Sequence, residues 1–204
     1  MEQKFDKNYF EQVYKNEKGF LWGINPNPLT KRILKIKSKG DVLDLGCGEG
    51  KDALFLAKKG FKVDAIDISE SAIKKLKERA LKEKISINAK VEDFDNYKIK
   101  NNYDVILSLA AIHFIEDRKN LQKMIKNIQD KTRRGGINVI TVFRKKDPSE
   151  GKFKMYFFED KELLKYYSSW KVIYYSEYLK EDKHNEKDKV HFHRNAEIIA
   201  QKIE

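Results

Sequence analysis

The chain has 204 residues, 40% of them hydrophobic and 12% aromatic, which is typical of a folded domain and excludes an intrinsically disordered chain. Its formal net charge is +11, but its 43 Lys and Arg are interspersed with 32 Asp and Glu, as on solvated helix faces, and this disfavours a nucleic-acid substrate. No apolar run is long enough to span a membrane.

The N-terminus predicts a cytoplasmic protein. Residues 1–7 are polar and of mixed charge, and no apolar segment of a secretory signal follows them. The single cysteine, Cys47, excludes an internal disulfide and a cysteine-cluster metal site. We expect one domain over residues 1–204, a helical segment at 1–36 followed by a core at 37–204, as a monomer or homodimer with no metal.

The first predicted strand, residues 42–45, leads into a glycine-rich turn. Asp44 lies near the end of the strand, and glycines then stand at every second position, 46, 48 and 50. Glycine permits the tight backbone turn that lets a loop approach a ligand closely. A dinucleotide fingerprint would need a glycine at Lys51, so this loop does not fit one.

Acidic residues follow the next two predicted strands. Asp67 ends the strand at 62–66. Its distance along the chain from the glycine-rich turn is close to the roughly 20 residues that separate such a turn from an acid that binds the two ribose hydroxyls. The alternative is that Asp67 caps the next helix, for which Ser69 is an equally good candidate. The third element, residues 85–94, ends in Asp93 and Phe94.

The rest of the chain continues the alternation of strands and helices. A buried strand at 103–109 precedes an amphipathic helix from Leu121 to Ile128, a turn at Gly135-Gly136 and a strand at 137–143. After a polar and aromatic insertion at 144–158 and a short helix at 162–167, strands at 171–179 and 190–203 suggest a hairpin. We therefore predict an α/β fold, a Rossmann-like, doubly wound, mostly parallel seven-stranded sheet with an antiparallel C-terminal strand and helices on both faces.

The glycine loop carries a resemblance to a known family. Asp44-x-Gly46-x-Gly48-x-Gly50 resembles the first motif of the class I S-adenosylmethionine-dependent methyltransferases. The resemblance implies that S-adenosyl-L-methionine is the cofactor and that an acid and an apolar side chain after the third strand meet its adenine. The implied cofactor-binding residues are Asp44, Gly46, Cys47, Gly48, Gly50, Asp67, Ile68, Asp93 and Phe94.

Further motifs resemble a smaller family within these methyltransferases. The segments 103–108, 135–136, 158–170 and 194–202 are together similar to the tellurite-resistance methyltransferases and their thiopurine-type relatives. That likeness implies methyl transfer to a small acceptor such as tellurite, selenite or a thiol. It also implies that residues 14–26, with Tyr14 and Trp22, form a lid over the site.

Histidines supply the candidates for acceptor chemistry. His113 follows the fourth strand at the ligand-binding edge, where an imidazole could act as a base, orient a nucleophile, or only pack as a pocket wall. The resemblance implies a histidine and arginines near the C-terminus that meet the substrate, although Asn185 stands where an arginine is expected. The C-terminal histidines could also form a metal triad or lie on the surface. The candidate catalytic residues are His113, His184, His191, His193 and Arg194.

Two alternative functions stay open. A nucleic-acid methyltransferase would carry the cluster 144–146 (Arg-Lys-Lys) in one contiguous basic patch around its pocket. A non-catalytic S-adenosylmethionine-binding module would bind the cofactor without transferring its methyl group.

Overall fold

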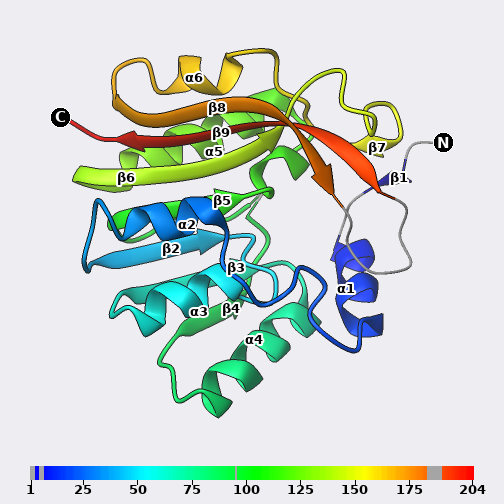
Figure 1. Cartoon of the computed structure of the whole chain (residues 1–204), viewed down its shortest axis with the longest axis vertical. Helices are drawn as coiled ribbons and strands as arrows, with labels where there is room; N and C mark the ends of the chain where they lie inside the picture. The colour runs from blue at the N-terminus through cyan, green and yellow to red at the C-terminus, as the bar shows by residue number, and fades with distance from the viewer. Residues whose placement is uncertain (1–2, 5–6, 95, 183–189) are drawn as a thin grey trace.

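A seven-stranded sheet forms the centre of the protein in the computed structural model, which describes residues 3–4, 7–94, 96–182 and 190–204 (Figure 1). The strand order is β4-β3-β2-β5-β6-β9-β8, and only β9 runs against its neighbours. These strands are β2 (Asp41–Leu45), β3 (Lys62–Asp67), β4 (Asn88–Val91), β5 (Tyr103–Leu109), β6 (Thr132–Phe143), β8 (Lys171–Asp182) and β9 (His191–Gln201). The predicted fold is confirmed, and the antiparallel strand is the C-terminal one.

Helices cover both faces of this sheet. In Figure 1, α2 and α3 lie on the face turned to the viewer, α5 lies behind the sheet, and α1 stands beside the strand ends. The helices are α1 (Lys7–Asn16), α2 (Pro28–Ile33), α3 (Lys51–Lys58), α4 (Glu70–Lys82), α5 (Arg118–Asp130), α6 (Glu162–Tyr166) and the short 3₁₀ helix η1 (Ile112–Phe114). A separate parallel pair joins β1 (Gln3–Lys4) to β7 (Phe153–Lys154). None of the described helices is long and apolar enough to cross a membrane.

Local sequence explains the start and the buried face of α4. The Ser69 hydroxyl accepts a hydrogen bond from the Ala72 amide at 3.1 Å, so Ser69 is the N-cap. Ile73 and Leu76 then recur at helical spacing and are buried against the sheet. Ser69, and not Asp67, therefore supplies the side-chain cap of this helix.

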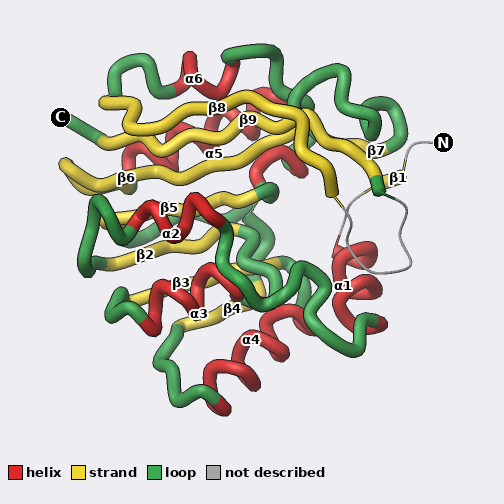
Figure 2. Tube along the Cα trace, viewed as in Figure 1, coloured by secondary structure: helices red, strands yellow, loops and turns green. Residues whose placement is uncertain are grey.

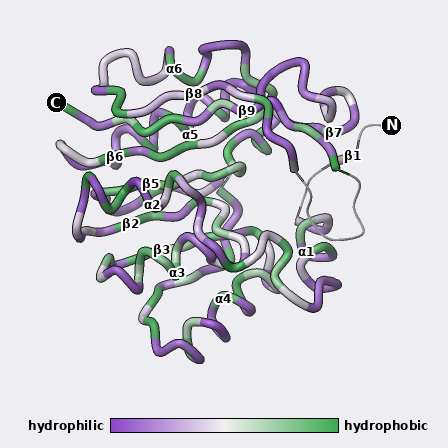
Figure 3. Tube along the Cα trace, viewed as in Figure 1, coloured by the Kyte–Doolittle hydropathy of each residue, from purple (hydrophilic) through white to green (hydrophobic). Residues whose placement is uncertain are grey.

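Two hydrophobic clusters fill the space between sheet and helices. Ile106 belongs to the cluster on the α5 side, whereas its neighbours Val105 and Leu107 belong to the cluster on the side of α2 and α3. Figure 3 shows hydrophobic stretches along the central strands and mixed colouring on the outer helices. Such double-sided burial is expected of a strand in a parallel sheet with both faces covered.

The predicted start of the strand at 137–143 was wrong. The sequence suggested a turn at Gly135-Gly136, but β6 already begins at Thr132, which pairs with Tyr103 beyond an irregularity in the ladder. The two glycines instead contact the end of the chain, because the Gly135 amide donates to the Lys202 carbonyl at 2.8 Å. Gly135 has φ +73°, and a Cβ on Gly136 would lie 2.8 Å from the Arg133 carbonyl oxygen, so the two glycines suit the irregular backbone within β6.

Candidate functional site

The loops that follow the parallel strands meet at one edge of the sheet, beside α1 (Figure 2). The glycine-rich turn after β2 lies there, fixed by its neighbour strand. The amides of Gly46 and Cys47 both donate to the Ile66 carbonyl at 2.9 Å. This edge is where open α/β sheets bind their ligands.

The turn needs glycines for space as well as for conformation. Gly46 has φ +73°, and a Cβ placed there would lie 2.4 Å from the Cβ of Ala111. Gly48 has φ +52°, and its Cβ would lie 2.7 Å from the Tyr14 hydroxyl oxygen. Side chains at these positions would collide with the surrounding elements, so the backbone itself forms the wall of the site.

Asp44 places an unpaired carboxylate oxygen behind this turn. The side chain is buried, and its Oδ2 has no hydrogen-bond partner in the described part of the chain. Burial, with smaller contributions from the charges of Asp52 and Asp67, raises the pKa of Asp44 well above its ordinary value. An unpaired buried carboxylate is costly unless a cation or a donor meets it. The turn therefore fits a ligand that brings positive charge, such as the ammonium and sulfonium of S-adenosylmethionine.

Asp67 lies on the other side of the turn. Its Oδ2 accepts a hydrogen bond from the Gly48 amide at 2.8 Å, and its Oδ1 accepts one from the Ser69 amide at 3.0 Å. Burial raises its pKa to about 6, although these amide hydrogen bonds act in the opposite direction. Each carboxylate oxygen has a second acceptor position, so Asp67 can still receive hydroxyl donors of a ribose.

The remaining predicted cofactor residues surround the same loop. The ring of Phe94 comes within 3.4 Å of a Cβ built on Gly46, which places Phe94 directly over the turn. Asp93 is exposed beside it, and Ile68 follows Asp67 half-buried. Burial raises the pKa of the Cys47 thiol well above its ordinary value, which keeps the thiol protonated and argues against a nucleophilic role.

Helix α1, the roof helix, lies across the site and contacts both α4 and η1. In the middle of the helix, Glu11 accepts hydrogen bonds from the Ser69 hydroxyl at 2.8 Å and the Ser71 amide at 3.0 Å, at the beginning of α4. The preceding residue, Phe10, packs its ring edge-on against Phe114 of η1, with centroids 5.0 Å apart. The helix thus joins elements on both sides of the glycine-rich turn.

The segment after α1 contacts the glycine-rich turn. Glu49 forms a buried ion pair with Lys75 of α4 at 2.9 Å and also accepts the Leu21 amide at 2.7 Å. The Trp22 indole donates to the Tyr14 hydroxyl at 3.0 Å, so Tyr14 and Trp22 act together above Gly48. These contacts bring Tyr14, Leu21 and Trp22 to the glycine-rich turn, and the lid over residues 14–26 stays a prediction.

A stack of three rings lies next to the turn. His113 of η1 stacks on Phe143 at the end of β6, with centroids 4.5 Å apart, and Phe143 stacks on His193 of β9 at 4.3 Å. His193 Nδ1 lies 3.3 Å from both carboxylate oxygens of Asp147. The antiparallel course of β9 brings His193 to this edge, because the start of β9 lies beside the end of β6.

The backbone between β5 and η1 is strained. Ala110 has φ +54°, a left-handed conformation that is uncommon for a residue with a side chain. Its amide donates to the Thr141 hydroxyl at 2.7 Å, which holds the turn in place. Strain of this kind clusters at functional sites, and here it directs Ala111 against the glycine-rich turn.

Comparison with known proteins identifies the family. The family model described as tellurite resistance protein TehB matches residues 6–194. The chain belongs to the TehB family. A protein named probable S-adenosyl-L-methionine-dependent methyltransferase TehB, from Haemophilus influenzae strain 10810, is 34% identical over 174 residues, which is 82% of this chain and 59% of that protein. The chain therefore matches less than two thirds of that relative's length.

Solved structures agree with the TehB assignment. The crystal structure of TehB from Haemophilus influenzae has a TM-score of 0.78 and 29% identity, covering 96% of this chain and 66% of that one. The N-methyltransferase NodS from Bradyrhizobium japonicum, solved with S-adenosyl-L-homocysteine, has a TM-score of 0.71 at 15% identity, covering 96% of this chain and 99% of that one. The second likeness concerns the fold alone.

On this TehB fold, the predicted acceptor residues separate. His191 and His193 share one face of β9, with ring centroids 4.9 Å apart, whereas Arg194 points to the other face, 3.8 Å from Asp160. His184 lies outside the described residues. Among the residues that are described, no group of three or more His, Cys, Asp and Glu has metal-binding geometry, and the triad that includes His184 stays a prediction.

Sequence reasoning missed several residues of this site. Phe143 and Asp147 take part in the ring stack and Glu11 holds α1, but none of these three stands in a recognisable motif. Glu49, which contacts Leu21 and Lys75, occupies a variable position of the glycine motif. The one local signal was Asp147-Pro148-Ser149, a typical turn sequence in which the Asp147 carboxylate accepts the Ser149 amide at 2.8 Å.

Proposed function

We propose that this chain acts as an S-adenosylmethionine-dependent methyltransferase of the TehB type. The observation that carries the proposal is the buried, unpaired Oδ2 of Asp44 behind a turn in which side chains have no room. A cationic ligand compensates that carboxylate, whereas a phosphate ligand would be repelled by it. The names of the matched relatives give independent support.

The residues of the site divide the work of binding. S-adenosylmethionine, when bound, supplies a methyl group on a positively charged sulfur. Asp44 balances the positive charge of the ligand's methionine end, Asp67 accepts the ribose hydroxyls, and Phe94 with Asp93 meets the adenine. Helix α1 closes the site against water, so that an acceptor is held in line with the methyl group.

We propose a small soft nucleophile, a chalcogen oxyanion such as tellurite or selenite or a thiol, as the acceptor. The description of the matching family, tellurite resistance protein TehB, supports a chalcogen oxyanion as the acceptor. The charges argue against nucleic acid: Arg144 is buried and pairs with Asp160 and Glu177, and Lys145 pairs with Glu159 at 2.7 Å. The basic cluster at 144–146 is thus largely neutralised within the protein.

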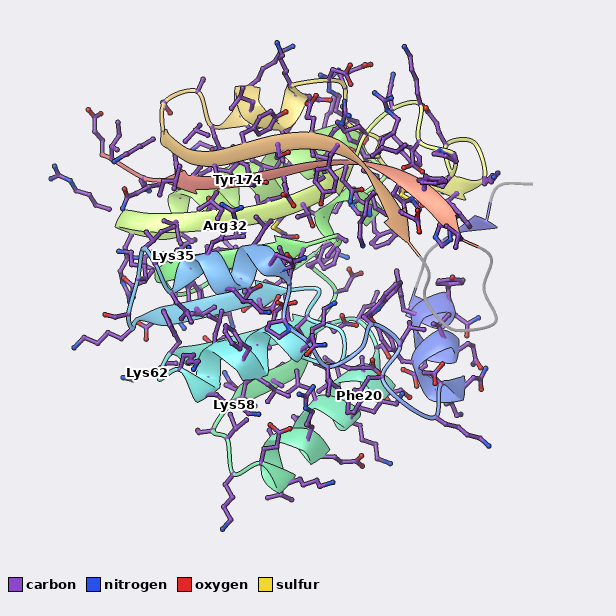
Figure 4. All side chains as sticks on the ribbon, in the orientation of Figure 1. Phe20, Arg32, Lys35, Lys58, Lys62 and Tyr174 are labelled. Atoms are coloured by element: carbon purple, nitrogen blue, oxygen red, sulfur yellow. The ribbon has the colours of Figure 1, made fainter. Side chains whose placement is uncertain are left out.

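Other lysines lie away from the site. Figure 4 labels Lys35, Lys58 and Lys62 on the side of the molecule opposite α1. Lys62 begins β3, at the end of that strand remote from the glycine-rich turn. The view also shows Arg32 of α2 beside Tyr174 of β8, a cation–π contact of 4.2 Å that occupies another surface cation.

Calorimetric titration of Asp44→Asn with S-adenosylmethionine tests the cofactor site. The dissociation constant should rise by about tenfold or more, because a charge-assisted contact is lost. The ligand-free variant should melt at a higher temperature, because an unpaired buried charge is removed. Asp41→Asn, on the same strand but paired with Arg133 at the surface, is the matched control. Equal affinities for wild type and Asp44→Asn would contradict the proposal.

The acceptor is tested by incubating the wild type with methyl-labelled S-adenosylmethionine and, separately, tellurite, selenite, thiols and small amines. We expect label in a chalcogen or sulfur product. Binding without transfer to any acceptor would instead support a non-catalytic cofactor-binding module, and transfer to amines alone would overturn the acceptor class.

A further inference from the structure

His113 is a buried polar side chain without a partner. Its side chain is fully buried, and neither Nδ1 nor Nε2 has a hydrogen-bond partner among the residues that the structure describes. A buried donor or acceptor left unpaired costs about 1–3 kcal/mol. Nearly all such groups in folded proteins are satisfied, so an exception calls for an explanation. A ligand that meets the ring would provide one.

The position of His113 relates it to the reaction centre. Ala111, two residues earlier, packs against the turn that contains Gly46. Phe114, the next residue, contacts Phe10 of the roof helix. His113 therefore stands in the chain between a residue that packs on the cofactor turn and one that contacts α1, and its own ring packs on Phe143. An acceptor held near a methyl group at that turn would lie close to this segment.

The wall behind His113 keeps its ring in one orientation. Phe143 stacks on it with an interplanar angle of 20°, and His193 stacks on the far side of Phe143 at 10°. Asp147 fixes the last ring through His193 Nδ1 and is itself held by the Arg194 amide at 2.6 Å. A ring held in this way keeps its two nitrogens in fixed positions, as a ligand-binding group requires.

His113 remains an uncharged imidazole at physiological pH. Burial and, to a smaller extent, the neighbouring His193 lower its pKa to about 3, while the Asp147 carboxylate opposes the shift. A neutral imidazole has one N–H donor and one acceptor nitrogen. It can therefore donate a hydrogen bond to an anion, but it is a poor base for removing a proton.

We propose that His113 is an acceptor-binding residue that donates a hydrogen bond from its ring N–H to an anionic nucleophile, a thiolate or a chalcogen oxyanion. This assignment rests on the proposed function. A lone pair of the nucleophile forms the new bond to the methyl carbon. The electron pair of the breaking carbon–sulfur bond stays on the cofactor sulfur and neutralises its positive charge. Because the nucleophile is already anionic, no proton is transferred.

His113→Phe separates this role from a structural one. The phenyl ring keeps the stack and removes both nitrogens, so the ligand-free variant should melt at the same temperature or higher. Its affinity for S-adenosylmethionine should stay within about twofold. Its kcat/KM for selenite or thiol should fall about 10- to 100-fold, the usual worth of a hydrogen bond to a charged group. His113→Gln, which restores an N–H donor, should recover part of that loss.

Binding can be followed without turnover by NMR. We expect the ¹⁵N signals of the His113 ring, assigned by their absence in His113→Phe, to shift when selenite or a thiol is added to the wild type saturated with S-adenosylhomocysteine. Unchanged signals, or a fully active His113→Phe, would overturn the inference and leave the proposed function standing. Failure of the wild type to bind S-adenosylmethionine would refute the proposed function itself.

Discussion

The two buried carboxylates at the glycine-rich turn, Asp44 and Asp67, differ in their hydrogen bonds. Asp67 has an amide donor on each oxygen, whereas Asp44 leaves Oδ2 unpaired. Both pKa values are raised by burial, and the charge of Asp67 adds to the shift at Asp44. A cationic ligand stabilises the ionised form of both carboxylates. In the ligand-free protein the two buried carboxylates therefore lower the stability of the fold.

The pH dependence of stability should reveal Asp67. Its pKa in the folded protein is about 6, above the value of about 3.9 for an unfolded aspartate. Its favourable contribution is therefore complete below about pH 4 and is lost as the pH rises through about 6. Between those limits the ligand-free wild type should lose up to about 3 kcal/mol relative to Asp67→Asn, which cannot ionise. Urea unfolding at several pH values measures this.

Asp130→Asn controls for the loss of a carboxylate as such. Asp130 is exposed at the end of α5, so its variant should follow the pH profile of the wild type. If Asp67→Asn also followed that profile, burial would not be shifting the titration of Asp67.

Among the elements, the roof helix α1 is attached to the core by hydrogen bonds to the beginning of α4 and by aromatic packing. Glu11 places its carboxylate at the beginning of α4, where backbone amides and the helix dipole favour negative charge. Although burial opposes the effect, the hydrogen bonds from Ser71 and Ser69 lower the pKa of Glu11. The helix is thus attached to the core by charge-assisted hydrogen bonds as well as by aromatic packing.

Glu11→Gln should loosen this attachment. We expect S-adenosylmethionine to dissociate about tenfold faster, because the charge-assisted bonds that close the roof are weakened. Amides of α1 should also exchange faster with deuterium. Stopped-flow release gives the rate, and Glu78→Gln, at an exposed position on α4, is the control. A release rate like that of the wild type would show that α1 does not limit cofactor exit.

Sequence patterns predicted the elements well where one face is buried. The cap at Ser69 and the apolar spacing of α5 are local, and both helices form as expected. The strand start predicted after Gly135-Gly136 was wrong, because β6 already pairs at Thr132, before the irregularity that contains the glycines. The partner in that pair, Tyr103, lies in another strand, so the neighbouring sequence does not show it.

For the whole molecule, β9 is the strand that connects the edge strand β8 to the parallel strands of the sheet. It lies between β6 and β8 and contributes Ile198, which is fully buried, to the core. Ile198→Ala should lower the free energy of unfolding by about 2–5 kcal/mol through the cavity it leaves. Ile203→Ala, a few residues later and 49% exposed, should change it by less than about 0.5 kcal/mol. Equal losses in urea unfolding would contradict this position for β9.

The sequence by itself determined the alternation of strands and helices, the glycine-rich turn with its acids, and the likeness to a methyltransferase family. These features are local, since hydrophobic periodicity, caps and turns depend on neighbouring residues. Only the tertiary structure decided that Phe143, His193 and Asp147 gather behind His113, that Arg194 turns away, and that Glu11 fastens the roof. Those contacts join residues far apart in the chain, and the order and direction of the strands bring them together.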